Sequence, residues 1–215
     1  MKKTPALLFF IAGIAIVMGI FFSIVMLGPA AEKFNPGDIL AFRNLKNRSL
    51  SGKVGAPFYL DTRFDSLVYF PPNQKEIYSA EVFWLPLPEE ADLMPDRPGY
   101  TSHLKTGFIV LEKETWRDSL YFYKNIEEPG DSLYFIPFAD LSNGKQSYGG
   151  GRYLDVNLKK GRKARIDFNF AYNPWCAYKD SYICAGIPAL NHLSKAIEAG
   201  EKTYPNTSHE SQKTH

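Results

Sequence analysis

A small set of polar residues near the C-terminus carries the side chains that could do chemistry. They are Asp167, Asn169, Asn173 and Cys176 in the stretch DFNFAYNPWCAY, Arg152 before it and Glu201 after it. Carboxylates can act as general acids or bases, an arginine can hold an anion, and amides can orient a bound group. The stretch starts as a strand and breaks at Asn173-Pro174, so these residues predict one wall of a polar pocket.

Arg152 has the strongest need for a partner. It lies two residues before Leu154 along a predicted strand, so both side chains point to the same, apolar face. A guanidinium on such a face needs an acidic partner. We expect Glu201 to be that partner, because it directly follows the glycine that ends a predicted helix. A negative charge at this end of a helix opposes the helix dipole and needs a compensating cation.

Three functions are compatible with this predicted pocket. Lined by Arg152, Asp167, Asn169, Asn173 and Glu201, it could bind a small polar or anionic ligand, or a partner in the cell envelope. Alternatively, it could be the active site of a hydrolase-like enzyme, with Asp167 or Glu201 as general acid or base and Arg152 as the anion holder. The third alternative is a purely structural polar cluster. The sequence identifies neither the ligand nor a reaction nor the oligomeric state.

The chain has two cysteines, Cys176 and Cys184. In an exported domain a disulfide between them is expected. Closing this nine-residue segment would contribute about 2.6 kcal/mol by loop-closure entropy. A reactive thiol, or half of a metal site completed by His192, is the alternative. We expect neither a metal site nor a cofactor.

Short aromatic and β-branched runs separated by prolines and glycines dominate the chain from Pro57 to Phe170, and they predict about eight or nine strands. A helix is expected after Asn35-Pro36, and a second one over residues 189–200 that ends at Gly200. The fold class is therefore all-β or β-dominated, a sandwich or a partly closed barrel with short flanking helices.

We expect the last two predicted strands, within residues 152–170, to form a hairpin. Pairing Val156 with Ile166 keeps the apolar residues on one face. The same register sets Asp155 opposite Asp167, where two carboxylates repel each other. Either Arg165 neutralises them at the surface, or they share a proton or a cation.

The N-terminal 30 residues form a separate segment. Residues 6–27 hold no charge and follow two lysines. A helix of this length would span about 33 Å, which predicts a transmembrane helix with a cytoplasmic N-terminus. We therefore expect a single-pass membrane anchor in residues 1–30, an extracytoplasmic β-rich domain in 34–204 and a disordered tail in 205–215. Cleavage as a signal peptide, leaving a secreted or periplasmic domain, is the alternative.

The nearly balanced overall charge favours neither a strongly acidic nor a strongly basic partner. The chain carries 25 basic and 23 acidic residues, for a formal net charge of +2. Such a balance gives no global attraction to nucleic acid, and no nucleic-acid partner is expected. The basic run KKGRKAR lies at the tip of the predicted hairpin, where a solvated turn is expected.

The chain resembles a bacterial family that is classed only as a domain of unknown function. The resemblance is carried by YFIPFADLSNGKQSYGGGRYLDV, by IDFNFAYNPWCAY, by the second cysteine with its downstream proline, and by NHLSKAIEAGEK. It extends from about Gly37 to Lys202. The resemblance implies a β-rich domain and no known reaction. This chain carries His192 where relatives tend to carry an arginine.

Overall fold

The computed structural model describes residues 33–94, 103–126 and 132–205. The chain divides into two compact units, Met1–Asn35 and Pro36–His215. Of the first unit only residues 33–35 are described, and they form neither a helix nor a strand. All helices and strands of the described residues therefore belong to the second unit.

Helix α2 (Pro36–Ser51) begins where the sequence predicts. Proline occupies its first position and Asp38 its first turn, where a negative charge interacts favourably with the helix dipole. Its buried face carries Ile39, Arg43 and Leu50. The helix ends at Ser51, and the N–H of the following Gly52 donates to the carbonyl of Arg48 at 2.9 Å.

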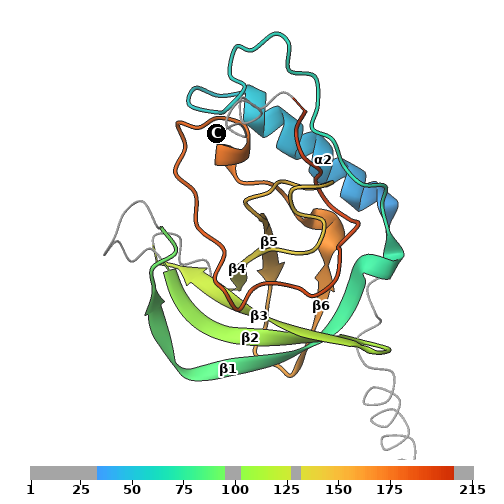
Figure 1. Cartoon of the computed structure of the whole chain (residues 1–215), viewed down its shortest axis with the longest axis vertical. Coiled ribbons are helices and arrows are strands. Elements are labelled where there is room, and N and C mark those ends of the chain that lie inside the picture. Colours follow the sequence, from blue (N-terminus) through green and yellow to red (C-terminus); the bar gives the residue numbers. More distant parts are fainter. Residues whose placement is uncertain (1–32, 95–102, 127–131, 206–215) are drawn as a thin grey trace, which may run out of the picture. The chain divides into compact units, whose positions relative to one another are not determined.

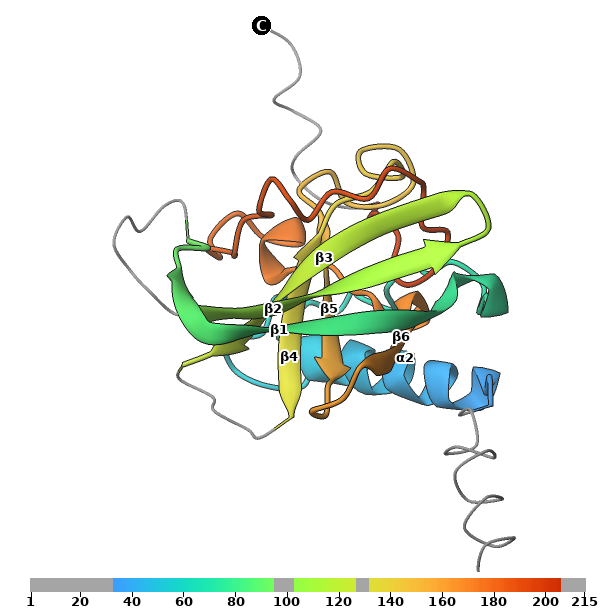
Figure 2. The same ribbon diagram turned by 90° about the horizontal axis from the view of Figure 1, so that it is seen from below.

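The described strands form one antiparallel, six-stranded sheet with the order β5-β4-β3-β2-β1-β6. Figure 1 shows the sheet curling into a half-barrel, and Figure 2 shows β4 crossing β1 to β3 steeply. This confirms the β-dominated class. The strands are β1 (Ile77–Ala91), β2 (His103–Lys113), β3 (Trp116–Asn125), β4 (Leu133–Phe138), β5 (Arg152–Asn157) and β6 (Lys163–Asp167). Three 3-10 turns accompany them: η1 (Gln74–Glu76), η2 (Phe168–Phe170) and η3 (Trp175–Ala177).

The runs TGFIVLEK and TWRDSLYFYKN also predict a hairpin, and the pairing of β2 with β3 confirms it. The strands pair from His103–Asn125 to Lys113–Trp116, with a bulge between Lys105 and Gly107. Gly107 is required there, because a Cβ at this position would lie 2.3 Å from the Phe83 carbonyl oxygen and 2.4 Å from the Phe122 ring.

The predicted hairpin of β5 and β6 is wrong, because these strands lie at opposite edges of the sheet. Val156 pairs with Tyr134 of β4, and Ile166 pairs with Tyr78 of β1. The predicted apolar face is nevertheless correct, since both residues are buried in the same core inside the curled sheet. An alternating pattern identifies the buried face of a strand but not its neighbour in the sheet. Here β4 is the neighbour of β5, and β1 is the neighbour of β6.

The predicted helix over residues 189–200 is also wrong, since these residues form irregular chain. Their backbone groups bond to other segments: Leu193 N–H donates to Ala139 at 2.8 Å, and the Lys195 carbonyl accepts from Leu141 at 3.2 Å. Leu193 and Ile197 are buried in the main core. The chain that directly follows β4 thus makes hydrogen bonds with backbone groups that a helix would have paired internally.

Two further predicted strands are absent from the described residues. Residues 57–60 form turns, and 65–70 are extended chain with a single bridge from Tyr69 to Glu201. The predicted membrane segment at 6–27 lies outside the described residues, as does nearly all of the predicted tail. No helix within the described ranges is long and apolar enough to cross a membrane.

A second apolar cluster beside the main core holds the C-terminal loops in place. Its members come from the end of α2, the loop after it, η3 and the last described residues: Leu50, Phe58, Leu67, Ala177, Tyr178 and Tyr204. The phenyl ring of Phe58 lies 5.4 Å from the ring of Tyr178 and 5.0 Å from that of Tyr204. These contacts fix the segment that follows residue 172.

Candidate functional site

Arg152 is fully buried, as its position among apolar residues predicts, but its acidic partner is Asp140 and not Glu201. The guanidinium lies 2.7 Å from the Asp140 carboxylate. It also donates to the carbonyls of Ala199 at 2.6 Å and Ile197 at 2.9 Å. Glu201 offers only its backbone carbonyl, at 3.2 Å. Arg152 therefore fixes the irregular C-terminal segment to the sheet.

Asp140 is equally engaged. Its other carboxylate oxygen accepts the N–H of Ser142 at 2.8 Å and of Ile197 at 3.1 Å. The sequence signal for this pair lay in the pairing of β4 with β5, in which Phe138 faces Arg152 and Asp140 follows two residues after Phe138. Because its donors bond to the chain itself, the Arg152 side chain is a structural element of the core.

Asp167 and Asn169 form a second buried group. Asp167 accepts both the N–H and the side-chain amide of Asn169, at 3.0 and 2.7 Å, and pairs with Arg165 at 2.9 Å. The amide of Asn169 also bonds the backbone N–H and carbonyl of Asn73. In the sheet Asp167 pairs with Ile77, so the predicted cross-strand pair of Asp167 with Asp155 does not form.

Glu201 and Asn173 form a third group. The Glu201 carboxylate is fully buried and accepts the backbone N–H of Asn173 at 3.0 Å and its side-chain amide at 2.8 Å. The Tyr178 hydroxyl also donates to it. Lys46 Nζ of α2 lies 4.0 Å away. Burial raises the pKa of Glu201 to about 7, while the nearby Lys46 acts in the opposite direction.

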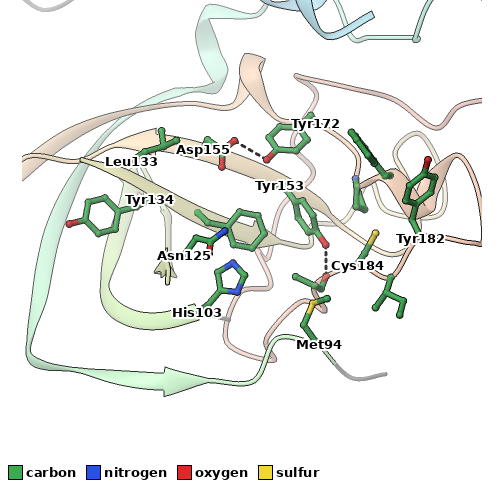
Figure 3. Close-up of a pocket in the computed structure, with 15 residues that line it drawn as sticks. Met94, His103, Asn125, Leu133, Tyr134, Tyr153, Asp155, Tyr172, Tyr182 and Cys184 are labelled. Atoms are coloured by element: carbon green, nitrogen blue, oxygen red, sulfur yellow. Dashed lines mark hydrogen bonds between the residues drawn. The ribbon is translucent and has the colours of Figure 1, made fainter. Parts of the chain in front are cut away.

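None of these five predicted pocket residues lines the cavity beside residues 172–185, although the DFNFAYNPWCAY stretch does. This cavity of about 440 Å³ lies between the outer face of β4–β5 and residues 172–185 (Figure 3). Phe135, Tyr153 and Asp155 point outward there, because they alternate with the core residues Ile136 and Leu154. The aromatic residues of the lining are Tyr134, Phe135, Tyr153, Tyr172, Trp175 and Tyr182.

The aromatic rings of the cavity are arranged edge to face. Phe135 and Tyr153 have ring centroids 4.7 Å apart, and Tyr153 and Tyr172 lie 5.9 Å apart at 88°. Trp175 and Tyr182 meet at 5.2 Å and 80°. Such pairs stabilise each other beyond the area that they bury, so the walls of the cavity support one another.

Three further polar residues belong to the lining: His103, Asn125 and Asp155. The hydroxyl of Tyr172 donates to the Asp155 carboxylate at 2.8 Å, and that of Tyr153 donates to the Ala185 carbonyl at 2.5 Å (Figure 3). Burial raises the pKa of both tyrosines above the usual value, so both keep their protons at neutral pH. Asp155 thus brings a negative charge to the cavity.

Lys46 links the cavity wall to the buried Glu201. Its ammonium lies 3.9 Å from the centroid of the Tyr172 ring and 4.0 Å from the Glu201 carboxylate. Burial lowers the pKa of Lys46, while the charges of Glu201 and Asp155 raise it. No sequence pattern indicates this contact, because α2 is distant in the chain from both acids.

The predicted disulfide is confirmed. Cys176 and Cys184 are bonded, with Cα atoms 6.0 Å apart. Cys184 lines the cavity, and the bridge closes the loop that carries Tyr182. The Tyr182 hydroxyl donates to the Gly55 carbonyl at 2.5 Å. The disulfide and this hydrogen bond together fix one wall of the cavity, and they leave Cys176 without the thiol that a nucleophile needs.

Among the described residues no group of three or more His, Cys, Asp or Glu side chains is arranged to hold a metal ion.

Comparison with known proteins identifies the family. A family model described as "Protein of unknown function (DUF1684)" matches residues 62–202. The chain belongs to the DUF1684 family. The match includes all six strands and the whole lining of the cavity, whereas α2 with Lys46 precedes it.

One of the solved structures that match this DUF1684 chain is an uncharacterized protein of Haloarcula marismortui, determined by solution NMR. The two are 30% identical with a TM-score of 0.62, and the match covers 78% of this chain and 93% of that protein. The search of curated proteins returned no match.

Proposed function

We propose that this DUF1684 domain binds a small organic molecule in the cavity between β4–β5 and residues 172–185. The observation that carries the proposal is the cavity itself, whose volume of about 440 Å³ falls in the range of ligand sites. Ligand sites combine mostly apolar and aromatic walls with a few polar groups that orient the ligand. Here Asp155, His103 and Asn125 are those polar groups.

The polar residues singled out from the sequence have an architectural role in this proposal. Arg152, Asp167, Asn169, Asn173 and Glu201 are buried, and each bonds to the chain itself. A ligand that approached them would have to displace internal hydrogen bonds. For the same reason, the geometry favours binding over a hydrolase that uses Asp167 or Glu201 as general acid or base.

The proposal includes a location. Residues 6–27 would anchor the protein in a membrane by a single span, with the cavity-bearing domain on the extracytoplasmic side. The uncharged run after two lysines and the Cys176–Cys184 disulfide support this location. Added protease should digest the domain in intact spheroplasts of an expressing cell, and the mass of the mature chain distinguishes an anchor from a cleaved signal peptide.

Ligand-observed NMR with a fragment library tests the binding function on the full chain in a neutral detergent. Ile183 lines the cavity and is 44% exposed, so Ile183→Trp should fill the cavity without disturbing the core. Leu190 is 66% exposed and is not part of the lining, so Leu190→Trp is the matched control. The proposal predicts fragments that bind the native chain and the control but not Ile183→Trp. Binding that survives Ile183→Trp would contradict it.

A further inference from the structure

We infer that Glu201 positions the wall of this cavity, so that binding there depends on whether its buried carboxylate is charged. The inference rests on the proposed function and concerns the regulation of the same cavity. Glu201 is not part of the lining. It is therefore a positioning residue, which acts through the segment that it holds and not by touching a bound molecule.

The contacts of Glu201 hold the cavity wall from behind. Its carboxylate accepts the backbone N–H and the side-chain amide of Asn173, at 3.0 and 2.8 Å, and the hydroxyl of Tyr178. Pro174 and Trp175, which line the cavity, lie between these two residues in the chain. One carboxylate therefore fixes both ends of the short segment that forms this part of the wall.

The charge of Glu201 is compensated less directly than that of the other buried acids in the described part of the chain. Glu76, Asp140 and Asp167 each have a lysine or arginine nitrogen between 2.7 and 3.3 Å from a carboxylate oxygen. The corresponding distance from Lys46 to Glu201 is 4.0 Å, which is too long for a hydrogen bond. A buried carboxylate with such weak compensation favours its neutral form, and the pKa of Glu201 is accordingly raised to about 7. Glu201 can therefore gain and lose its proton near neutral pH.

The titratable groups that face this carboxylate, within the described residues, are Lys46 of α2, Tyr178 after η3 and Tyr69 of the extended chain before η1. Burial raises the pKa of both tyrosines, which therefore keep their protons near neutral pH. Lys46 is also attracted by Asp155 of the cavity, and it lies 3.9 Å from the centroid of the Tyr172 ring. Lys46 is therefore a second connection between the buried carboxylate and the cavity wall.

Loss of the proton should tighten the wall. An ionised carboxylate accepts shorter and stronger hydrogen bonds than a neutral carboxyl group, so the donors of Asn173 and Tyr178 are held best when Glu201 is charged. The buried charge costs folding free energy, but its contacts with the wall are the stronger ones. A molecule that binds against Pro174 and Trp175 gains from a fixed wall, since less conformational freedom is lost on binding. Binding in the cavity should therefore strengthen as the pH rises through about 7.

The first test follows the wall without any ligand. In the isotope-labelled full chain in a neutral detergent, the indole N–H signal of Trp175 should shift with pH, with a midpoint of about 7. Glu201→Gln, which cannot ionise, should abolish this transition. Lys46→Met should move the midpoint to higher pH, because Lys46 lowers the pKa of Glu201. Glu198→Gln, the same change at an exposed residue of the same segment, is the matched control and should leave the transition unchanged.

The second test measures binding with an uncharged fragment from the ligand-observed screen, because such a probe exchanges no proton of its own near neutral pH. Its affinity should rise about three- to fivefold between about pH 6 and 8 in the native chain and in Glu198→Gln. The affinity should stay constant in Glu201→Gln. By reciprocity the fragment should lower the pKa of Glu201 and move the Trp175 midpoint to lower pH. His103 also lines the cavity and histidines titrate in this range, so His103→Gln is measured in parallel and should keep the pH dependence.

The outcomes separate the two proposals. A rise in affinity that persists in Glu201→Gln, or that disappears in His103→Gln alone, would overturn this inference while the binding function stands. A Trp175 signal without a transition would overturn it as well. If Glu201→Gln does not fold, Lys46→Met decides, since an unchanged or lower midpoint contradicts the inference. If no fragment binds in a manner that Ile183→Trp blocks, the proposed function falls, and the Trp175 transition still decides whether Glu201 positions the wall.

Discussion

The buried ion pair of Arg152 and Asp140 allows the sharpest prediction about stability. Asp140→Ala leaves the guanidinium without a counter-ion and removes the acceptor for two backbone N–H groups. Breaking a buried pair costs about 3–5 kcal/mol, and each buried donor left unpaired adds about 1–3 kcal/mol. Since these terms overlap, we expect a loss of about 4 kcal/mol or more, a large part of the stability of a typical domain.

Denaturant unfolding followed by tryptophan fluorescence measures this loss. Arg152→Met should cost a similar amount, because the carbonyls of Ile197 and Ala199 lose their donor. The double variant should cost less than the sum of the two, by about 2–3 kcal/mol, because the pair acts as a unit. The matched control is Arg165→Met, whose ion pair with Asp167 is partly exposed and should contribute about 1 kcal/mol or less.

The reasoning would be refuted if Asp140→Ala cost no more than Arg165→Met. It would also be refuted if Arg152→Met were coupled to Glu201→Gln rather than to Asp140→Ala, since this would restore the partner that the sequence suggested.

Three further predictions follow from single contacts. Between about pH 4.5 and 7 the free energy of unfolding should fall by up to about 3 kcal/mol as the pH rises, because folded Glu201, with a pKa of about 7, retains a proton that the unfolded chain has already released. Glu201→Gln should flatten this slope in thermal unfolding scans, and an unchanged slope would contradict the assignment. Replacing Cys176 and Cys184 together by serine should lower stability by about 2.6 kcal/mol, measured by urea unfolding; equal midpoints with and without the disulfide would be inconsistent with this. Gly107→Ala should cost about 2 kcal/mol or more because its Cβ would overlap the Phe122 ring; a melting temperature within a degree of the native value would argue against this close approach.

Local patterns predicted the parts of the fold that depend on neighbouring residues. The Pro36–Asp38 signal identified the start of α2, and the alternation of the aromatic runs identified the β2–β3 hairpin. The alternation in β5 also identified its buried face, including Arg152. In each case the deciding interactions lie within a few residues or across a tight turn.

Long-range pairing could not be read from the same patterns. The choice of β4 rather than β6 as the neighbour of β5 depends on how the whole sheet curls, and the correct acid for Arg152 depends on that choice. The spacing of Leu193 and Ile197 also fits a helix, but residues 139–141 and the Arg152 side chain bond to the backbone groups that a helix needs.

The cavity was missed because sequence reasoning followed charged and amide side chains. Tyr153 and Asp155 alternate with Arg152 on β5 and therefore share the opposite face, next to Tyr172 and Trp175 of the later stretch. Aromatic residues that alternate with core residues on an edge strand were the available signal. Only the fold shows that residues 172–185 cover that face.

Chemical-shift mapping on the isotope-labelled full chain in detergent, with a fragment that binds in the ligand-observed screen, tests the central claim most directly. We predict that the perturbed amides gather at residues 172–185 and at Tyr153 and Asp155, around the cavity. Perturbations that gather instead at Asn73 and residues 165–169, around the buried Asp167, would contradict it.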